Sequence, residues 1–420
     1  MDKRTFLKKS KLLGVSSIVS MDAIGKMIES VSHLSPEQIA SDDDFWTNIR
    51  GGYKLKSEYI NLENGYYCIM PQETLEKQIQ HIRDVNLHGS FYMRTVQYEN
   101  KKKIAAQLSE IAGCTPEELI ITRNTTESLD MIISGLDWQP GDEAVMAVQD
   151  YGAMLDMFRQ VSKRYGIVNK MISVPLHPHS DEEIVELYEK AITEKTKLLM
   201  VCHMINITGQ ILPVKKICDM ARKKNVQVMV DGAHAFAHIQ FKISELGCDY
   251  YGCSLHKWLS TPLGAGLLYV KKERIPGVWP LFAESERKAD DISRLNHTGT
   301  IPVHVDLTIP DAIEFYKKIG AERKEARLRY LQRYWTDQVR NVPDIILNTP
   351  KEPERSCAIA NVGVKGKTPA ELQKILYEQY KIYTVAIDGA EVHGCRITPN
   401  VYTTTAELDV LVKALNKISE

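Results

Sequence analysis

Val226-Gln-Val-Met-Val-Asp231-Gly-Ala-His234 is an apolar run of strand length that ends in an acidic residue. An acidic side chain at the carboxyl end of a buried strand lies where α/β sheets bind ligands. A carboxylate there is costly to bury unless a cation meets it. Asp231 is therefore a candidate ligand-binding residue, although the segment alone is also compatible with a helix N-cap aspartate.

A second stretch, Asp249-Tyr-Tyr-Gly-Cys-Ser254-Leu-His256-Lys257-Trp258, places a lysine at the end of the next strand. Burial lowers the pKa of a lysine and makes its amine nucleophilic towards an aldehyde. Ser254 and His256 can donate to a phosphate. An aldehyde, a phosphate and a cation for Asp231 together describe pyridoxal 5'-phosphate (PLP). We expect Lys257 to hold PLP as a Schiff base, with Asp231 on the pyridinium nitrogen, where it keeps the ring an electron sink.

A third stretch, Asn124-Thr125-Thr126-Glu127, begins a helix. Backbone N–H groups at a helix N-terminus, with the hydroxyls of Thr125 and Thr126, form an anion site that suits the cofactor phosphate. The alternative is a plain N-cap with Glu127 in the first turn, and this segment by itself favours that simpler interpretation.

The pattern around these stretches alternates between strand-like and helix-like segments. Buried parallel strands read as uninterrupted apolar runs, and a βαβα order predicts a parallel sheet with helices on both faces. We therefore predict an α/β fold with a mostly parallel, seven-stranded type of sheet. The strands are expected near 118–122, 144–148, 197–202 and 226–230, with helices at 152–164 and 214–224.

The length of 420 residues suggests more than one domain. Residues 1–44, rich in Ser, Asp and Lys, are interpreted as a leader. Residues 45–309 are expected to form a large PLP-binding domain with an N-terminal arm. Residues 310–420 begin with a long charged helix and continue as a smaller α+β domain.

The leader starts with Lys3-Arg4-Thr5-Phe6-Leu7-Lys8, which resembles a twin-arginine export motif whose first arginine is replaced. The alternative is an amphipathic leader on a cytosolic enzyme. The expected location is accordingly either the cytoplasm or, after export, the periplasm. No stretch is long enough to span a bilayer.

Charge and cysteine spacing exclude several classes of protein. The formal net charge of -1 gives no electrostatic argument for nucleic acid. None of the eight cysteines forms a CxxC pair, so a zinc ribbon or an iron–sulfur cluster is not indicated. The pairs His234/His238 and His177/His179 lack an HExxH motif or a carboxylate triad, and we expect no metal site.

Together these motifs resemble the class V aminotransferase group of fold-type I PLP enzymes, which includes cysteine desulfurases, selenocysteine lyases, kynureninases and isopenicillin N epimerases. The resemblance runs from about Tyr59 to the C-terminus. It rests on residues 231–234 and 254–258 and on Gly264-Ala-Gly-Leu-Leu-Tyr269. His256-Lys-Trp-Leu and Gln149-Asp-Tyr151-Gly-Ala-Met are most similar to the isopenicillin N epimerase-like branch.

The resemblance implies further roles. Tyr151 would stack on the PLP ring, and Asn206 and His234 would lie near its phenolic oxygen. Gly299-Thr300 would reach the phosphate of the neighbouring subunit, which implies a homodimer. Arg396 would hold the α-carboxylate of an amino-acid substrate, a role that suits a guanidinium, although a surface ion pair is the simpler alternative.

The reaction itself is left open by these residues. Lys257, once freed, is the best candidate to remove the α-proton. Return of the proton to the other face gives epimerisation or racemisation, and protonation at the cofactor gives transamination. A cysteine-independent β-lyase and a non-catalytic PLP-binding regulator are the alternatives.

Cysteine desulfurase chemistry is not expected. It needs a thiolate on a mobile loop over the cofactor. The corresponding stretch here reads Ala386-Ile-Asp-Gly-Ala-Glu-Val-His393-Gly394 and has no cysteine. Cys395 adjoins Arg396 on an expected strand, where packing is the better explanation for it.

Overall fold

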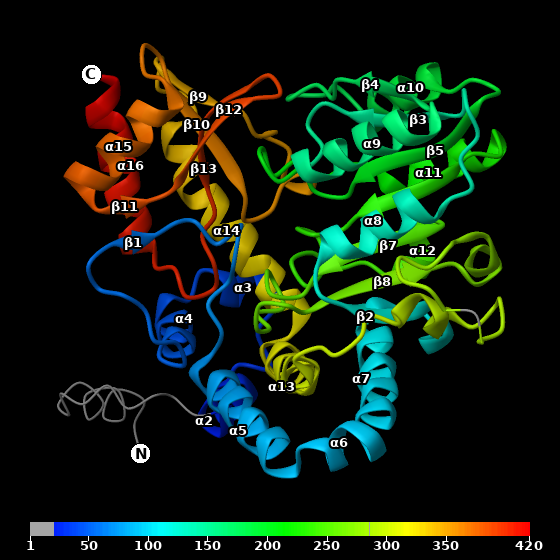
Figure 1. Ribbon diagram of the computed structural model, residues 1–420. Helices are drawn as coiled ribbons and strands as arrows, with labels where there is room; N and C mark the ends of the chain where they lie inside the picture. The colour runs from blue at the N-terminus through cyan, green and yellow to red at the C-terminus, as the bar shows by residue number, and fades with distance from the viewer. Residues whose placement is uncertain (1–20, 285) are drawn as a thin grey trace.

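The computed structural model describes residues 21–284 and 286–420. Its larger domain is built on a seven-stranded sheet in the order β2-β8-β7-β6-β5-β3-β4 (Figure 1). Strands β3 to β7 run parallel, whereas β8 is antiparallel to both β7 and β2. The strands are β2 Leu119–Thr122, β3 Glu143–Ala147, β4 Val168–Ile172, β5 Thr196–Cys202, β6 Gln227–Asp231, β7 Tyr250–Ser254 and β8 Gly266–Val270. The predicted fold class is confirmed.

Apolar side chains fill both faces of this sheet. On one face Leu129 of α8 (Thr125–Gly135) and Phe158 of α9 (Gly152–Tyr165) share a core with Met200. On the other, α11 (Val214–Lys223) contributes Ile217. Because parallel strands are covered on both sides, their sequences are apolar without alternation.

The smaller domain holds a sheet in the order β12-β13-β10-β9. Its strands are β9 Ile345–Leu347, β10 Ala360–Val364, β12 Val385–Gly389 and β13 Val392–Ile397, and its helices are α15 Pro369–Tyr380 and α16 Thr405–Ser419. Near the N-terminus, β1 (Ile60–Asn61) pairs in parallel with β11 (Ile382–Tyr383). Residues 60–61 therefore lie with the small domain, as the blue segment beside the red and orange ones shows in Figure 1.

Long helices connect the two domains. α13 (Val303–Ile319) packs against α5 (Gln72–His88) and α7 (Gln97–Ala112) at the bottom of Figure 1, where α6 (Ser90–Thr95) also lies. α14 (Ala321–Val339) then runs up to the small domain and packs against α16. The expected domain boundary after residue 309 falls inside α13.

The folded body begins earlier than expected. Residues 21–50 form α2 (Met21–Ser30), α3 (Pro36–Ala40) and α4 (Asp43–Arg50), and Ile24 and Ile39 are buried in the main core. Residues 21–44, which were expected to belong to a leader, thus contribute buried side chains to the main core, because their polar composition hid these few apolar residues. The twin-arginine-like motif lies outside the described residues. Across the described chain, no helix combines the length and apolarity needed to cross a membrane.

Candidate active site

The predicted site residues gather at one edge of the large sheet. Asp231 ends β6 and Ser254 ends the neighbouring strand β7. At the same edge Ser254 faces Gly266, the first residue of β8, which in turn faces the last residue of β2. Parallel strands bring their carboxyl ends together, which is why residues far apart in sequence meet here.

The expected phosphate site lies at the N-terminus of α8. The Thr125 N–H donates to Ser254 Oγ over 2.9 Å, and the two hydroxyls lie 2.7 Å apart. A Cβ on Gly266 would come within 2.7 Å of the Asn124 backbone, so glycine permits this close approach. Thr126 is partly buried in the first turn. Hydroxyls and a helix N-terminus therefore converge in a form that suits an anion.

The same segment is also an ordinary helix N-cap, as the simpler interpretation predicted. The Asn124 side chain accepts from the Glu127 N–H over 2.8 Å and so caps α8. His256 follows Ser254, and its Nδ1 is buried without a hydrogen-bond partner among the described residues. Burial lowers the pKa of His256 to about 4.

The side chain of Lys257 contacts the imidazole of His234. Its Nζ lies 3.0 Å from His234 Nε2. Burial lowers the pKa of Lys257 to about 8, and the nearby Asp231 carboxylate opposes part of this shift. Burial also holds the pKa of His234 well below its usual range. The amine is therefore substantially neutral near pH 8, the form that attacks an aldehyde.

Asp231 is buried and is the last residue of β6, which is followed by turns rather than by a helix. Its Oδ1 accepts from the Ala233 N–H over 2.9 Å. Residues 232–239 form turns and bends, so the N-cap alternative for Asp231 is excluded. Burial raises its pKa, and the Lys257 ammonium acts in the opposite direction.

Asp150 is a site residue that the sequence reasoning missed. It is buried, its Oδ2 accepts from the Ala147 N–H over 2.8 Å, and burial raises its pKa to about 8, with Asp231 adding to the shift. The signal was present, because Asp150 follows β3 as an acidic residue at a strand end. Tyr151, the next residue, caps α9 and is 46% exposed, as a ring offered to a ligand would be.

Arg396 lies on β13 and is buried, so it is no surface ion pair. It pairs with the Glu63 carboxylate, which the sequence reasoning did not single out. Its Nη1 also donates to the backbone oxygen of Asn206 over 3.2 Å. Arg396 and Asn206 are thus brought together, through the main chain of Asn206.

The segment with Thr300 is exposed, and Gly299 has a φ of +73°. Within the part of the chain that the structure describes, Thr300 forms no hydrogen bond or ion pair with the other predicted site residues. Nearby, Thr298, Arg123 and Gly264 line a small cavity. The role of Thr300 in a neighbouring subunit remains a prediction.

Cys395 is fully buried, and burial raises the pKa of its thiol to about 12. Its Sγ donates to the Pro369 oxygen over 3.5 Å. The preceding stretch forms the hairpin of β12 and β13 instead of a loop.

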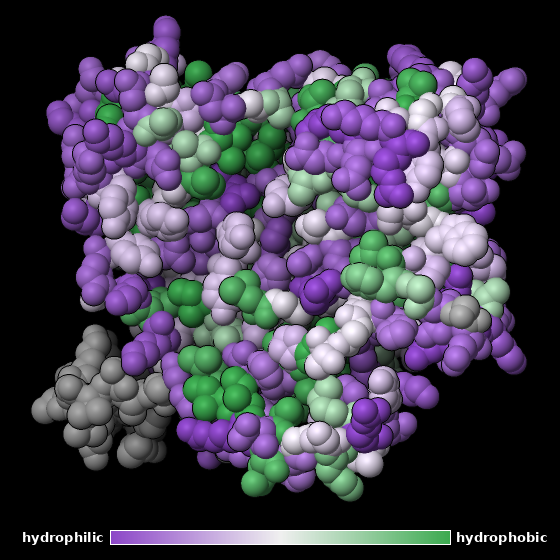
Figure 2. All heavy atoms as spheres, viewed as in Figure 1, coloured by the Kyte–Doolittle hydropathy of each residue, from purple (hydrophilic) through white to green (hydrophobic). Residues whose placement is uncertain are grey.

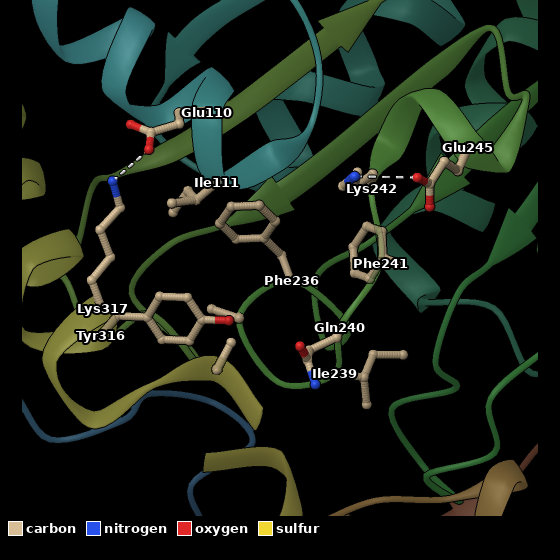
Figure 3. Close-up of a pocket in the computed structure, with 12 residues that line it drawn as sticks. Glu110, Ile111, Phe236, Ile239, Gln240, Phe241, Lys242, Glu245, Tyr316 and Lys317 are labelled. Carbon is tan, nitrogen blue, oxygen red and sulfur yellow. Dashed lines mark hydrogen bonds and ion pairs between the residues drawn. The ribbon is translucent and has the colours of Figure 1, made fainter. Parts of the chain in front are cut away.

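A separate cavity of about 600 Å³ lies beyond the turn that follows Asp231 (Figure 3). Phe236, Phe241 and Tyr316 line it, and ion pairs Glu110–Lys317 and Lys242–Glu245 stand at its edges. None of the predicted site residues lines it. Among the described residues, no group of His, Cys, Asp or Glu side chains is arranged to hold a metal ion.

With this geometry in place, comparison with known proteins settles the family. The model of the aminotransferase class-V family matches residues 69–411. The chain belongs to this family. The class-V assignment agrees with the motifs at Asp231 and Lys257.

Curated relatives of this class-V chain carry out different reactions. It is 27% identical over 399 residues to the isopenicillin N epimerase of Amycolatopsis lactamdurans, covering 89% of this chain and 99% of the relative. It is 25% identical over 391 residues to the cysteine desulfurase of Haloferax volcanii, covering 86% and 89%. The family therefore leaves the reaction open.

Solved structures confirm the fold-type I architecture. The cysteine desulfurase of Thermococcus onnurineus NA1 has a TM-score of 0.79 at 19% identity, with 89% of this chain and 97% of that chain covered. The cystine C–S lyase C-DES has a TM-score of 0.76 at 22% identity, with 85% and 97% covered.

The class-V chain is a PLP-dependent enzyme, and its donor set fits the cofactor. Hydroxyls and a helix N-terminus suit the phosphate. A buried lysine with a lowered pKa suits the aldehyde, and the buried Asp231 carboxylate suits the pyridinium nitrogen.

Proposed function

We propose that this enzyme acts at the α-carbon of an amino acid by removing the α-proton, in epimerase- or racemase-type or transaminase-type chemistry. The observation that carries the proposal is the contact between Lys257 and His234 at 3.0 Å beside the Asp231 carboxylate. Because burial lowers the pKa of Lys257 to about 8, a substantial fraction of the amine is neutral near that pH and can accept a proton at Nζ.

Each remaining site residue has a proposed task. PLP, when bound, supplies an electron sink for the charge left at the α-carbon. Its phosphate would be held by Thr125, Thr126, Ser254 and His256, and its ring nitrogen by Asp231. Its phenolic oxygen would meet His234 and Asn206, and Tyr151 would stack on its ring.

Arg396 orients the substrate by binding its α-carboxylate. A guanidinium does this with parallel N–H donors, which fixes the α-carbon in front of the base. Lys257 then exchanges the α-proton at its Nζ.

We propose a homodimer in which Thr300 completes the partner's phosphate site. Support comes from the exposed Gly299-Thr300 segment and from large apolar side chains left on the surface. Ile82 and Leu87 of α5 and Phe91 of α6 are 43%, 79% and 65% exposed. Figure 2 shows hydrophobic residues gathering along the lower edge, where Figure 1 places these helices. Exposed patches of this kind mark interaction sites.

The experiment that tests the function is an amino-acid screen in deuterated water with the PLP-loaded enzyme. It follows α-deuterium exchange, keto-acid formation and sulfide release in parallel. Exchange without net product supports epimerisation, and keto acid that needs an amino acceptor supports transamination. Products of β-elimination without α-exchange in recovered substrate would favour a cysteine-independent lyase and contradict the proposal.

A further inference from the structure

The Glu63–Arg396 ion pair lies inside the proposed substrate site. Arg396 Nε donates to Glu63 Oε2 over 3.2 Å, and Arg396 Nη2 donates to Glu63 Oε1. The two side chains are only 7% and 8% exposed. This is a bidentate pair shielded from water, so it differs from a screened surface contact.

The pair is built into the backbone around it. The Tyr66 N–H donates to Glu63 Oε1 over 3.0 Å, and the Glu63 N–H donates to Asn61 Oδ1 over 3.1 Å. A Cβ on Gly65 would lie 2.7 Å from the Arg396 guanidinium carbon, so the absence of a side chain there admits the arginine. Glu63 also forms a parallel bridge with Thr398, two residues beyond Arg396.

Most of the N–H donors of Arg396 therefore already have a hydrogen-bond acceptor within the protein. A guanidinium has five N–H donors in a fixed fork. Glu63 takes the side formed by Nε and Nη2, and the Asn206 oxygen takes one donor of Nη1. A substrate carboxylate therefore has to bind to the remaining N–H groups of Nη1 and Nη2, or it has to displace Glu63.

Around Arg396 the ion pair with Glu63 is already neutral, so an α-carboxylate bound there adds a negative charge to a buried part of the site, next to the Glu63 carboxylate. Uncompensated charge is costly where water is excluded. A positive charge on the substrate, placed against Glu63, removes that cost.

We propose that Glu63 is a specificity-determining residue that makes this site prefer amino acids with a cationic side chain over neutral ones of the same length. The proposal rests on the proposed function of Arg396 as the carboxylate-binding residue. It names the substrate class of that same site.

The test uses the PLP-loaded enzyme and two probes with the same carbon chain, ornithine and norvaline, whose dissociation constants are read from the cofactor absorption. The unmodified enzyme is expected to bind ornithine at least about tenfold more tightly. In Glu63→Gln the norvaline affinity is expected to rise about tenfold or more, and the preference for ornithine to disappear. Glu63→Asp keeps the charge and is expected to keep the preference.

Glu407→Gln is the matched control. Glu407 also forms a bidentate pair, with Nη1 and Nη2 of Arg50 at 2.9 Å for both contacts, but it lies on α16 outside the site. It is expected to leave both constants unchanged. Thermal melts and cofactor content show whether each variant folds. If Glu63→Gln does not fold, the unmodified enzyme carries the test, because equal affinities for ornithine and norvaline would overturn the proposal.

Two failures are distinguishable. If both probes bind and Glu63→Gln leaves their ratio unchanged, the role of Glu63 is overturned and the proposed function stands. If neither probe binds to the enzyme or to any variant and no α-deuterium exchange occurs, the amino-acid function falls, and the inference falls with it. Norvaline binding that appears only in Glu63→Gln supports the proposal.

Discussion

The Nζ of Lys257 lies 3.0 Å from Nε2 of His234, and the Trp258 indole N–H donates to Nδ1 of the same imidazole over 3.4 Å. An imidazole that accepts at Nδ1 carries its proton on Nε2 when neutral. That proton then points at Lys257, which can accept it only as a neutral amine. Trp258 therefore favours the tautomer that provides a donor at the cofactor side and a nucleophilic lysine.

Lys257→Ala is expected to abolish the covalent attachment of PLP. Borohydride reduction followed by mass spectrometry should place the adduct on Lys257 in the unmodified protein. Lys324 is a stringent control, because burial also lowers its pKa to about 8, yet its Nζ donates to the Trp258 oxygen. An adduct on Lys324 would contradict the assignment.

Asp231→Ala is expected to retain part of the PLP through the phosphate contacts and to lose about a hundredfold or more in activity, because the ring becomes a poor electron sink. Asp231→Asn is the matched control for shape. Activity in either variant equal to that of the unmodified enzyme would remove Asp231 from the mechanism.

The rate at which PLP attaches to the apoprotein is expected to rise with pH and level off above about 8. Lys257 has a lowered pKa of about 8, so the amine is protonated below this pH and nucleophilic above it. Trp258→Phe removes the donor to His234 and should move the midpoint upward by about 0.7 pH unit, the equivalent of one ordinary hydrogen bond. A midpoint near the value of an exposed lysine in the unmodified protein would show that burial does not lower this pKa.

The sheet could be predicted, and the candidate cofactor residues could be singled out, because both depend on local patterns. Apolar runs mark β5 and β6, and the acid and the lysine at strand ends mark the site. The role of Asp231 as a buried carboxylate followed from its place on a strand. Such signals are contained in a few consecutive residues.

The Glu63–Arg396 pair could not be predicted in this way, because its two members are far apart in sequence. The pairing of β1 with β11 and the bridge between Glu63 and Thr398 bring the N-terminal segment to the small domain. The burial of Ile24 and Ile39 in the main core was also missed, since short amphipathic helices among polar residues resemble a leader. Tertiary packing, rather than local pattern, decides both features.

Asp150→Asn is expected to leave the fold intact, whereas Asp150→Ala should destabilise it by about 1–3 kcal/mol, because the Ala147 N–H loses its acceptor. Burial raises the folded pKa of Asp150 to about 8, above its unfolded value. Between about pH 4 and 8 the folded state therefore binds the extra proton, and this contribution to stability decreases as pH rises, by at most about 1.4 kcal/mol per pH unit. In urea unfolding at pH 5 and pH 8, the free energy of unfolding of Asp150→Asn should rise relative to that of the unmodified protein at the higher pH. If the difference in free energy of unfolding between the two proteins is the same at both pH values, the pKa of Asp150 is not raised.

Leu87→Glu, on the exposed apolar surface of α5, is expected to raise the dissociation constant of the dimer at least tenfold in sedimentation experiments. A charge in an interface core has to be desolvated. Ile346→Glu is the control, since Ile346 is 51% exposed on β9 of the small domain. A monomer still fully loaded with PLP would contradict both the dimer and the role of Thr300.

Cys395→Ser is expected to leave turnover within about twofold of the unmodified enzyme and to leave sulfide release from cysteine undetectable in both proteins. A desulfurase thiolate has to be accessible and deprotonated. Cys395 is fully buried, its pKa is raised to about 12, and its Sγ donates to the Pro369 oxygen on the side of α15. The hairpin of β12 and β13 holds its backbone in a regular ladder, opposite Ala386 and Val362. Reaching a substrate sulfur would require this strand to leave the sheet. Sulfide release from free cysteine, together with a persulfide on Cys395 by mass spectrometry, would overturn this prediction.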